Sequence, residues 1–149
     1  MRRTVLIAFI AVLVFPAMTA KKSSLASPVI KPTVDKIELV VTAYYKPLRG
    51  QKRYATGSYR GDVRLNGTGI TFFGQDADEG CAAADLTILP KGSLIKMPDD
   101  EILKIGDIGK DIKGNKLDKF VGSGEKALAR ALEQGKRKIV VEILRRGDH

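Results

Sequence analysis

The sequence has no tryptophan, one cysteine and one histidine, and these shortages exclude several kinds of chemistry. Because Cys81 is the only cysteine, no disulfide can form within the chain. The only histidine is the last residue, His149, which argues against a cysteine–histidine nucleophile and against a zinc site built from these ligands. Cys81 begins the run Cys-Ala-Ala-Ala and is therefore predicted to be a small, buried apolar residue.

Long apolar runs are also scarce. The run at residues 5–14 is about half as long as the 20 or so residues that a membrane-spanning helix needs. Two arginines precede it, so residues 1–20 are predicted to be an export signal, cut after Ala20 or after Ala26; a retained signal anchor is the alternative. We expect an exported protein of the periplasm, the outer membrane or the extracellular cell wall, with no stable membrane span after processing.

Acidic residues are the minority among the charged ones. The chain has 26 Lys and Arg against 17 Asp and Glu, a net charge of +9, which becomes +7 without the two arginines of residues 1–20. In an exported protein this balance favours contact with anionic envelope polymers or membrane surfaces, and a merely soluble basic surface is an equal alternative. The basic residues are scattered and no nucleic-acid motif is visible, so nucleic acid is not an expected partner.

The chain divides into a tether and one compact domain. Residues 21–36 are rich in Lys, Ser and Pro and are predicted to be flexible. The domain is expected at 37–144, which is long enough for one hydrophobic core, with a short tail at 145–149. We expect a monomer.

Short apolar segments separated by glycines predict a mainly β fold. One helix is predicted at 125–134, with Ser123 as its N-cap, Gly135 after its end and an apolar stripe. Segment 46–59 is predicted to be an exposed loop. Seven short strands and one helix in the C-terminal half indicate a small β-barrel or sandwich. The strands are expected at 37–44, 69–73, 81–85, 93–97, 102–107, 114–120 and 138–144, and the stripe is Ala127, Leu128, Ala131 and Leu132.

Three aspartates, Asp85, Asp107 and Asp118, lie beside glycines or at the ends of predicted strands. Glycine permits positive φ and lets a ligand approach the backbone closely, so Gly109 and Gly114, between the last two aspartates, suit an active-site hairpin. We expect the three carboxyl groups to meet in one cleft. Taken singly, each aspartate has a plainer interpretation as a turn or surface residue.

These residues resemble the three-aspartate (3D) domain, a module similar to the catalytic part of the membrane-bound lytic transglycosylase A type. The resemblance covers about residues 38–144. It implies a double-psi β-barrel that cleaves the β-1,4 bond from N-acetylmuramic acid to N-acetylglucosamine in peptidoglycan and leaves a 1,6-anhydro end. Peptidoglycan strands are therefore the expected partner, and no cofactor or metal is expected. The resemblance is carried by Thr42-Ala43-Tyr44, Ala83-Ala84-Asp85, Leu89-Pro90-Lys91-Gly92, Asp107-Ile108-Gly109 and Ile112-Lys113-Gly114 up to Asp118.

By position, the resemblance implies that Asp118 is the acid/base, with Asp107 and Asp85 as its companions. One carboxyl group suffices for this reaction, because the sugar's own 6-hydroxyl replaces water as the attacking group. The acid must carry its proton near neutral pH, although a free Asp has a pKa of about 3.9. Burial and nearby carboxylates both raise the pKa of a carboxyl group, so clustered aspartates would meet this need.

The resemblance also implies a substrate-binding set. Thr42 falls where a supporting hydroxyl is expected, and Tyr44, Gly109 and Gly114 are expected to line the glycan site.

The sequence departs from the family pattern in two places. Lys110 and Asp111 stand where small residues are usual, and Leu86 replaces a proline after Asp85. These changes leave open a second interpretation, a glycan-binding module that does not cut. A third is a Ca²⁺ or Mg²⁺ site formed by the three aspartates with Asp76, Asp78 and Glu79.

Overall fold

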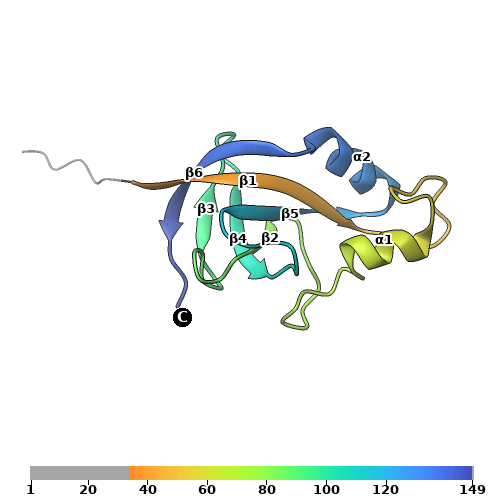
Figure 1. Cartoon of the computed structure of the whole chain (residues 1–149), viewed down its shortest axis with the longest axis horizontal. Helices are drawn as coiled ribbons and strands as arrows, with labels where there is room; N and C mark the ends of the chain where they lie inside the picture. The colour runs from red at the N-terminus through yellow and green to blue at the C-terminus, as the bar shows by residue number, and fades with distance from the viewer. Residues whose placement is uncertain (1–33, 149) are drawn as a thin grey trace, which may run out of the picture. The chain divides into compact units, whose positions relative to one another are not determined.

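The computed structural model describes residues 34–148, so the predicted export signal and most of the predicted tether lie outside the described residues. The described residues form six strands and two helices, and Figure 1 shows how these are arranged. Between residues 34 and 148, no helix is long and apolar enough to cross a membrane. The elements are β1 (Asp35–Lys46), α1 (Tyr59–Asn66), β2 (Cys81–Ala84), β3 (Leu94–Lys96), β4 (Ile102–Asp107), β5 (Lys116–Ser123), α2 (Gly124–Gln134) and β6 (Arg137–Arg145).

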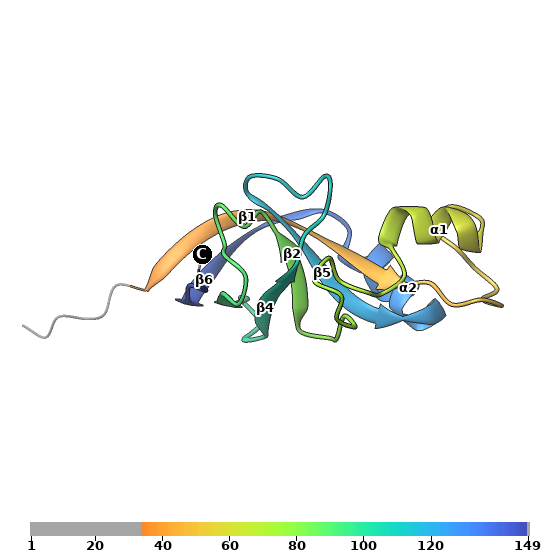
Figure 2. The same ribbon diagram turned by 90° about the horizontal axis from the view of Figure 1, so that it is seen from below.

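The six strands close in a ring in the order β1-β5-β2-β4-β3-β6, with β6 paired to β1 again. Two neighbouring pairs are parallel, β1 with β5 and β2 with β4, and the other four are antiparallel. Both helices pack near the end of the ring where β1 finishes (Figures 1 and 2). The mainly β prediction is confirmed.

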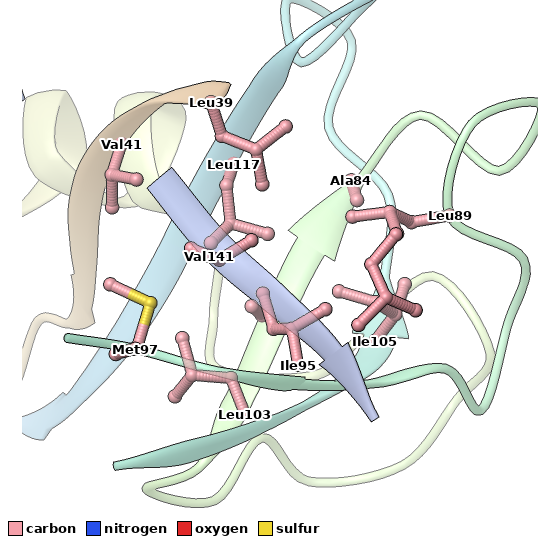
Figure 3. Packing of buried hydrophobic residues seen from close by; sticks show 12 residues of the cluster. Leu39, Val41, Ala84, Leu89, Ile95, Met97, Leu103, Ile105, Leu117 and Val141 are labelled. Atoms are coloured by element: carbon pink, nitrogen blue, oxygen red, sulfur yellow. The ribbon is translucent and has the colours of Figure 1, made fainter. Parts of the chain in front are cut away.

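One apolar cluster fills the ring. Alternate residues of the strands point inward, as the period-2 pattern predicts, and they meet in the interior (Figure 3). Burying one such aliphatic side chain contributes about 1.5–3 kcal/mol, so this cluster is the main stabilising element of the domain. Its fully buried members are Leu39, Val41, Ala82, Ala84, Leu89, Ile95, Leu103, Ile105, Leu117 and Val141.

The predicted C-terminal helix is present as α2, with Ser123 at its N-cap position and Gly135 after its end. The Ser123 side chain makes no capping hydrogen bond. Ala127 and Leu128 are buried against Tyr45 and its neighbours, but the predicted apolar stripe is too wide: the Leu132 side chain is 57% exposed.

The expectation of a single helix is wrong, because α1 precedes the domain's middle strands. Ser58 caps α1 by accepting a hydrogen bond from the Gly61 amide. The carboxyl group of Asp62, fully buried in α1, accepts hydrogen bonds from the Tyr45 hydroxyl and from the Ala55 and Thr56 amides. Although burial opposes its charge, a hydrogen bond from the Thr56 hydroxyl and the three just named lower the pKa of Asp62. A tertiary contact therefore stabilises this short helix.

The strand predicted at 69–73 is also wrong. This segment is a turn closed by one isolated bridge between Ile70 and Asp76 and by a hydrogen bond from the Thr71 amide to Gln75. Ile70 and Phe72, whose β propensity suggested a strand, have exposed side chains.

The two ends of the described chain are joined. β1 begins at Asp35, two residues before the predicted start of the domain, and β6 ends at Arg145. The guanidinium of Arg146 donates to Asp35 at 2.8 Å and to the Ile88 carbonyl at 2.9 Å. The predicted tail is therefore tied to the ring at its first residues.

Candidate active site

The strand register brings two of the three aspartates together. β2 lies between β4 and β5, and Ala83 of β2 is paired with Asp107 on one side and with Asp118 on the other. Two strand spacings of about 4.8 Å place the Cα atoms of the aspartates about 10 Å apart. The small side chain of Ala83 stands between two carboxyl groups that face the same pocket.

Asp118 is half-buried, and its carboxyl group has one defined partner. Thr42, its register neighbour on β1, donates from Oγ1 to Oδ1 of Asp118 at 2.7 Å. Burial raises the pKa of Asp118; the Thr42 hydrogen bond opposes this shift, and the negative charge of Asp107 adds to it. Asp118 is therefore a carboxyl group that keeps its proton to higher pH than a free aspartate.

Asp107 is buried and held by three donors. The Tyr44 hydroxyl donates to Oδ2 at 3.0 Å, while the amides of Phe72 and Ile108 donate to Oδ1 at 2.7 and 2.8 Å. Burial, and then the charge of Asp107, raise the pKa of Tyr44, so its hydroxyl remains a donor. These contacts fix the position of the Asp107 carboxyl group beside Asp118.

The two aspartates line an open pocket of about 330 Å³. Of the four predicted substrate-binding residues, Tyr44 and Gly109 line this pocket and Gly114 does not. Thr42 does not line it either, but its hydroxyl donates a hydrogen bond to Asp118, which does. A Cβ at Gly109 would lie 2.5 Å from Cγ1 of Ile112, so glycine allows the loop to fold back here. The other lining residues are Arg64, Leu65, Asn66, Gly67, Gly69, Ile70, Phe72, Ala83, Ile108 and Lys110.

Asp85 does not line this pocket, contrary to the expectation that all three aspartates share one cleft. Its Oδ1 accepts from the amide and hydroxyl of Thr87 at 3.1 and 2.8 Å, and its Oδ2 accepts from the Gly114 amide at 2.8 Å. These hydrogen bonds, that from Gly114 first, lower the pKa of Asp85. Gly114 has φ of 64°, a conformation that suits glycine. Asp85 thus joins the turn after β2 to the loop before β5.

The described residues offer no metal site of the kind considered from the sequence. Between residues 34 and 148, no group of three or more Asp, Glu, His or Cys side chains could hold an ion. Glu79 instead pairs with Arg130, and Asp76 lies 3.9 Å from the Lys46 ammonium.

Cys81 is buried, as predicted. Burial, and then the charge of Asp107, raise the pKa of the Cys81 thiol to about 11, which is unsuited to a nucleophile.

Several pocket residues were not predicted. Arg64 and Leu65 come from α1, and Ile70 and Phe72 come from the turn that replaces the predicted strand. The sequence held one signal for α1, because Ser58 is a residue type that often caps the N-terminus of a helix. The hydrogen bond from Tyr45 to Asp62, which stabilises α1, joins two separate segments and has no local signal in the sequence.

No protein-family model matches the sequence, and no curated protein matches it. Among solved structures, the chain is similar to the lytic transglycosylase MltA from E. coli, with 22% identity and a TM-score of 0.43 over 52% of this chain and 27% of that one. MltA from Neisseria gonorrhoeae matches with 23% identity and a TM-score of 0.41 over 54% of this chain and 22% of that one. The lytic transglycosylase LtgG of Burkholderia pseudomallei matches with 21% identity and a TM-score of 0.37 over 51% and 27%. The match thus spans about a quarter of the length of these proteins.

Proposed function

We propose that the protein is a peptidoglycan-cleaving enzyme of the lytic transglycosylase kind, with Asp118 as its acid/base. The observation that carries this proposal is the half-buried carboxyl group of Asp118, with its raised pKa, beside Asp107 in an open pocket. Cleavage of a glycosidic bond requires a carboxyl group that protonates the leaving oxygen, and a raised pKa favours the protonated form of Asp118.

The reaction needs one proton, which returns to its donor. Asp118 protonates the oxygen of the β-1,4 bond as the bond to the N-acetylmuramic acid C1 breaks. The resulting Asp118 carboxylate then takes the proton of the 6-hydroxyl of the same sugar as that oxygen bonds to C1. Thr42 occupies Oδ1 of Asp118, and Oδ2 accepts no hydrogen bond from residues 34–148, so Oδ2 is the oxygen free to carry the proton.

Asp107 acts in this scheme as a fixed negative charge. Held by Tyr44 and two amides, it raises the pKa of Asp118 in the resting pocket and then stabilises the positive charge that develops on the sugar ring. Tyr44 and Gly109 contact the glycan from the pocket wall. Asp85 and Gly114 serve as positioning residues for the loop that carries Lys110.

The setting of the proposed activity is the cell envelope, after export, with the protein as a monomer. The two parallel pairs of the ring, β1/β5 and β2/β4, support a double-psi arrangement.

Digestion of purified sacculi tests the proposal. The full chain without residues 1–20 should release soluble muropeptides with 1,6-anhydro ends, detected by mass spectrometry. Asp118→Asn should lower the rate by at least about 100-fold, the usual contribution of a general acid. Asp99→Asn, an exposed aspartate outside the pocket, is the matched control and should cleave like the wild type. Soluble products with reducing ends would show hydrolysis and refute the proposal.

The alternative is a glycan-binding module on the same fold. Lys110, which stands where the three-aspartate pattern implies a small residue, lines the pocket and is the observation that favours it. Co-sedimentation with sacculi without any soluble product would identify such a module.

A further inference from the structure

The pocket that holds the aspartates also carries two cations without acidic partners. Arg64 lies in the last turn of α1 and Lys110 in the loop after β4, and both line the pocket with exposed side chains. Neither forms an ion pair with another residue of the described segment 34–148. Asp111, which follows Lys110, is exposed and does not line the pocket. These two charges are therefore available to a ligand.

The cations are separated from the carboxyl groups inside the pocket. No carboxylate oxygen of Asp107 or Asp118 lies within 4.0 Å of Arg64 or Lys110. The pKa of Asp118 is set by burial, Thr42 and Asp107, and not by a cation. The pocket thus combines a buried and a half-buried carboxyl group with two exposed cations that form no ion pair with them.

Exposed apolar side chains complete the mouth of the pocket. Leu65 is 68% exposed, Ile70 50% and Phe72 70%, and all three line the pocket. The hydrogen bond from the Phe72 amide to Asp107 holds the backbone of Phe72 next to that aspartate. Grouped large apolar side chains at a pocket indicate a binding surface. The apolar C–H faces of sugar rings match a surface of this kind.

We propose that Arg64 and Lys110 select glycan strands that carry free carboxylates, as a lactyl group or a peptide stem does, over neutral strands of the same sugars. This inference rests on the proposed function and adds a substrate preference to it. A guanidinium binds a carboxylate through two parallel hydrogen bonds, and Lys110 adds a second positive charge. The apolar side chains of Leu65, Ile70 and Phe72 contact the sugar rings without regard to charge.

The test compares two probes that differ only in charge. One is a peptidoglycan-derived tetrasaccharide of alternating N-acetylglucosamine and N-acetylmuramic acid with free lactyl carboxylates, and the other is the same compound with carboxamides. Calorimetric titration uses Asp118→Asn as the parent, so that neither probe is cut. We expect the parent to bind the acid about tenfold more tightly, because two exposed charge contacts contribute on this order. This preference should weaken as salt is added.

Two double variants of the parent identify the residues responsible. Arg64→Gln with Lys110→Gln should bind both probes equally, because the charge contacts to the acid are lost. Arg60→Gln with Lys126→Gln removes two exposed cations outside the pocket and should keep the preference. Circular dichroism checks that each variant is folded.

Equal binding of both probes by the parent, or a preference that survives the loss of Arg64 and Lys110, would overturn the inference. If the wild type still cleaves sacculi, the proposed function stands and only the selection by charge is wrong. If the parent binds neither probe and the wild type releases no anhydro product, both proposals fail together.

Discussion

Removal of the Tyr44 hydroxyl tests how firmly Asp107 must be held. Tyr44→Phe deletes the 3.0 Å hydrogen bond to Oδ2 of Asp107 and keeps the ring, which packs against Phe120 with its centroid 5.3 Å away. Both partners of the lost bond are buried, at 8% exposure each, so water does not replace the hydroxyl freely. A hydrogen bond to a charged group contributes about 1.5–3 kcal/mol, and we expect the free energy of unfolding to fall by this amount.

In a domain of this size, that loss lowers the melting temperature by roughly 5–15 °C. It should also lower the rate of anhydro-muropeptide release by about 10- to 100-fold, because Asp107 is no longer fixed beside Asp118. Thermal melting followed by circular dichroism and digestion of sacculi at a temperature where the variant is folded measure the two effects separately.

The adjacent tyrosine supplies the matched control. Tyr45 is also buried, and its hydroxyl donates to the buried Asp62, away from the pocket. Tyr45→Phe removes a buried hydrogen bond of the same kind but leaves the donors of Asp107 in place, so it should lower the melting temperature and reduce cleavage by the folded protein less than Tyr44→Phe does. If Tyr44→Phe melts and cleaves like the wild type, Asp107 does not depend on this hydrogen bond and our description of the pocket is wrong.

Three further predictions concern the acid, the loop and the second helix. Because burial raises the pKa of Asp118 above the ordinary value of 3.8, the folded chain holds this proton more tightly than the unfolded one; this part of the stability is complete at pH below 3.8 and is lost as the pH rises through the raised pKa. Asp118→Asn cannot titrate, so its melting temperature relative to the wild type should increase from acid to neutral pH, and an equal pH dependence in both proteins would contradict the shift. Asp85→Ala should speed hydrogen exchange of the Gly114 amide, measured by NMR, since its acceptor at 2.8 Å is lost; unchanged exchange would mean that Asp85 does not hold the loop. Leu128→Ala should lower the free energy of unfolding by about 2–5 kcal/mol in urea titrations, whereas Leu132→Ala should change it by less than about 0.5 kcal/mol, and equal effects would contradict the burial of α2.

The parts of the fold that local pattern determines were predictable from the sequence. Six of the seven predicted strands are present. Their apolar side chains fill the interior of the ring, so the local apolar pattern was enough to predict them. The helix α2 follows from its periodicity and from Gly135. The segment at 69–73 has the same kind of composition, yet its apolar side chains lie exposed at the pocket, so propensity alone gave the wrong structure.

The candidate site was predictable only in part. The positions of Asp107 and Asp118 on either side of a common strand agree with the expected cleft. The separation of Asp85 was not predictable, because it depends on the loop around Gly114 folding back to the turn after β2. The residues of α1 were missed for a similar reason, since the buried contact between Tyr45 and Asp62 links segments that sequence patterns treat separately.

The position of Ala83 between Asp107 and Asp118 has a consequence for what the candidate site needs in order to form. Asp107 and Asp118 are near neighbours along the chain, but the strand that spaces them comes from an earlier part of it. A fragment that begins after Ala84 would keep both aspartates and lose the strand that lies between them, so nothing would hold the two carboxyl groups at a fixed spacing. The relative position of the two aspartates is therefore a property of the closed ring and not of the segment that carries them.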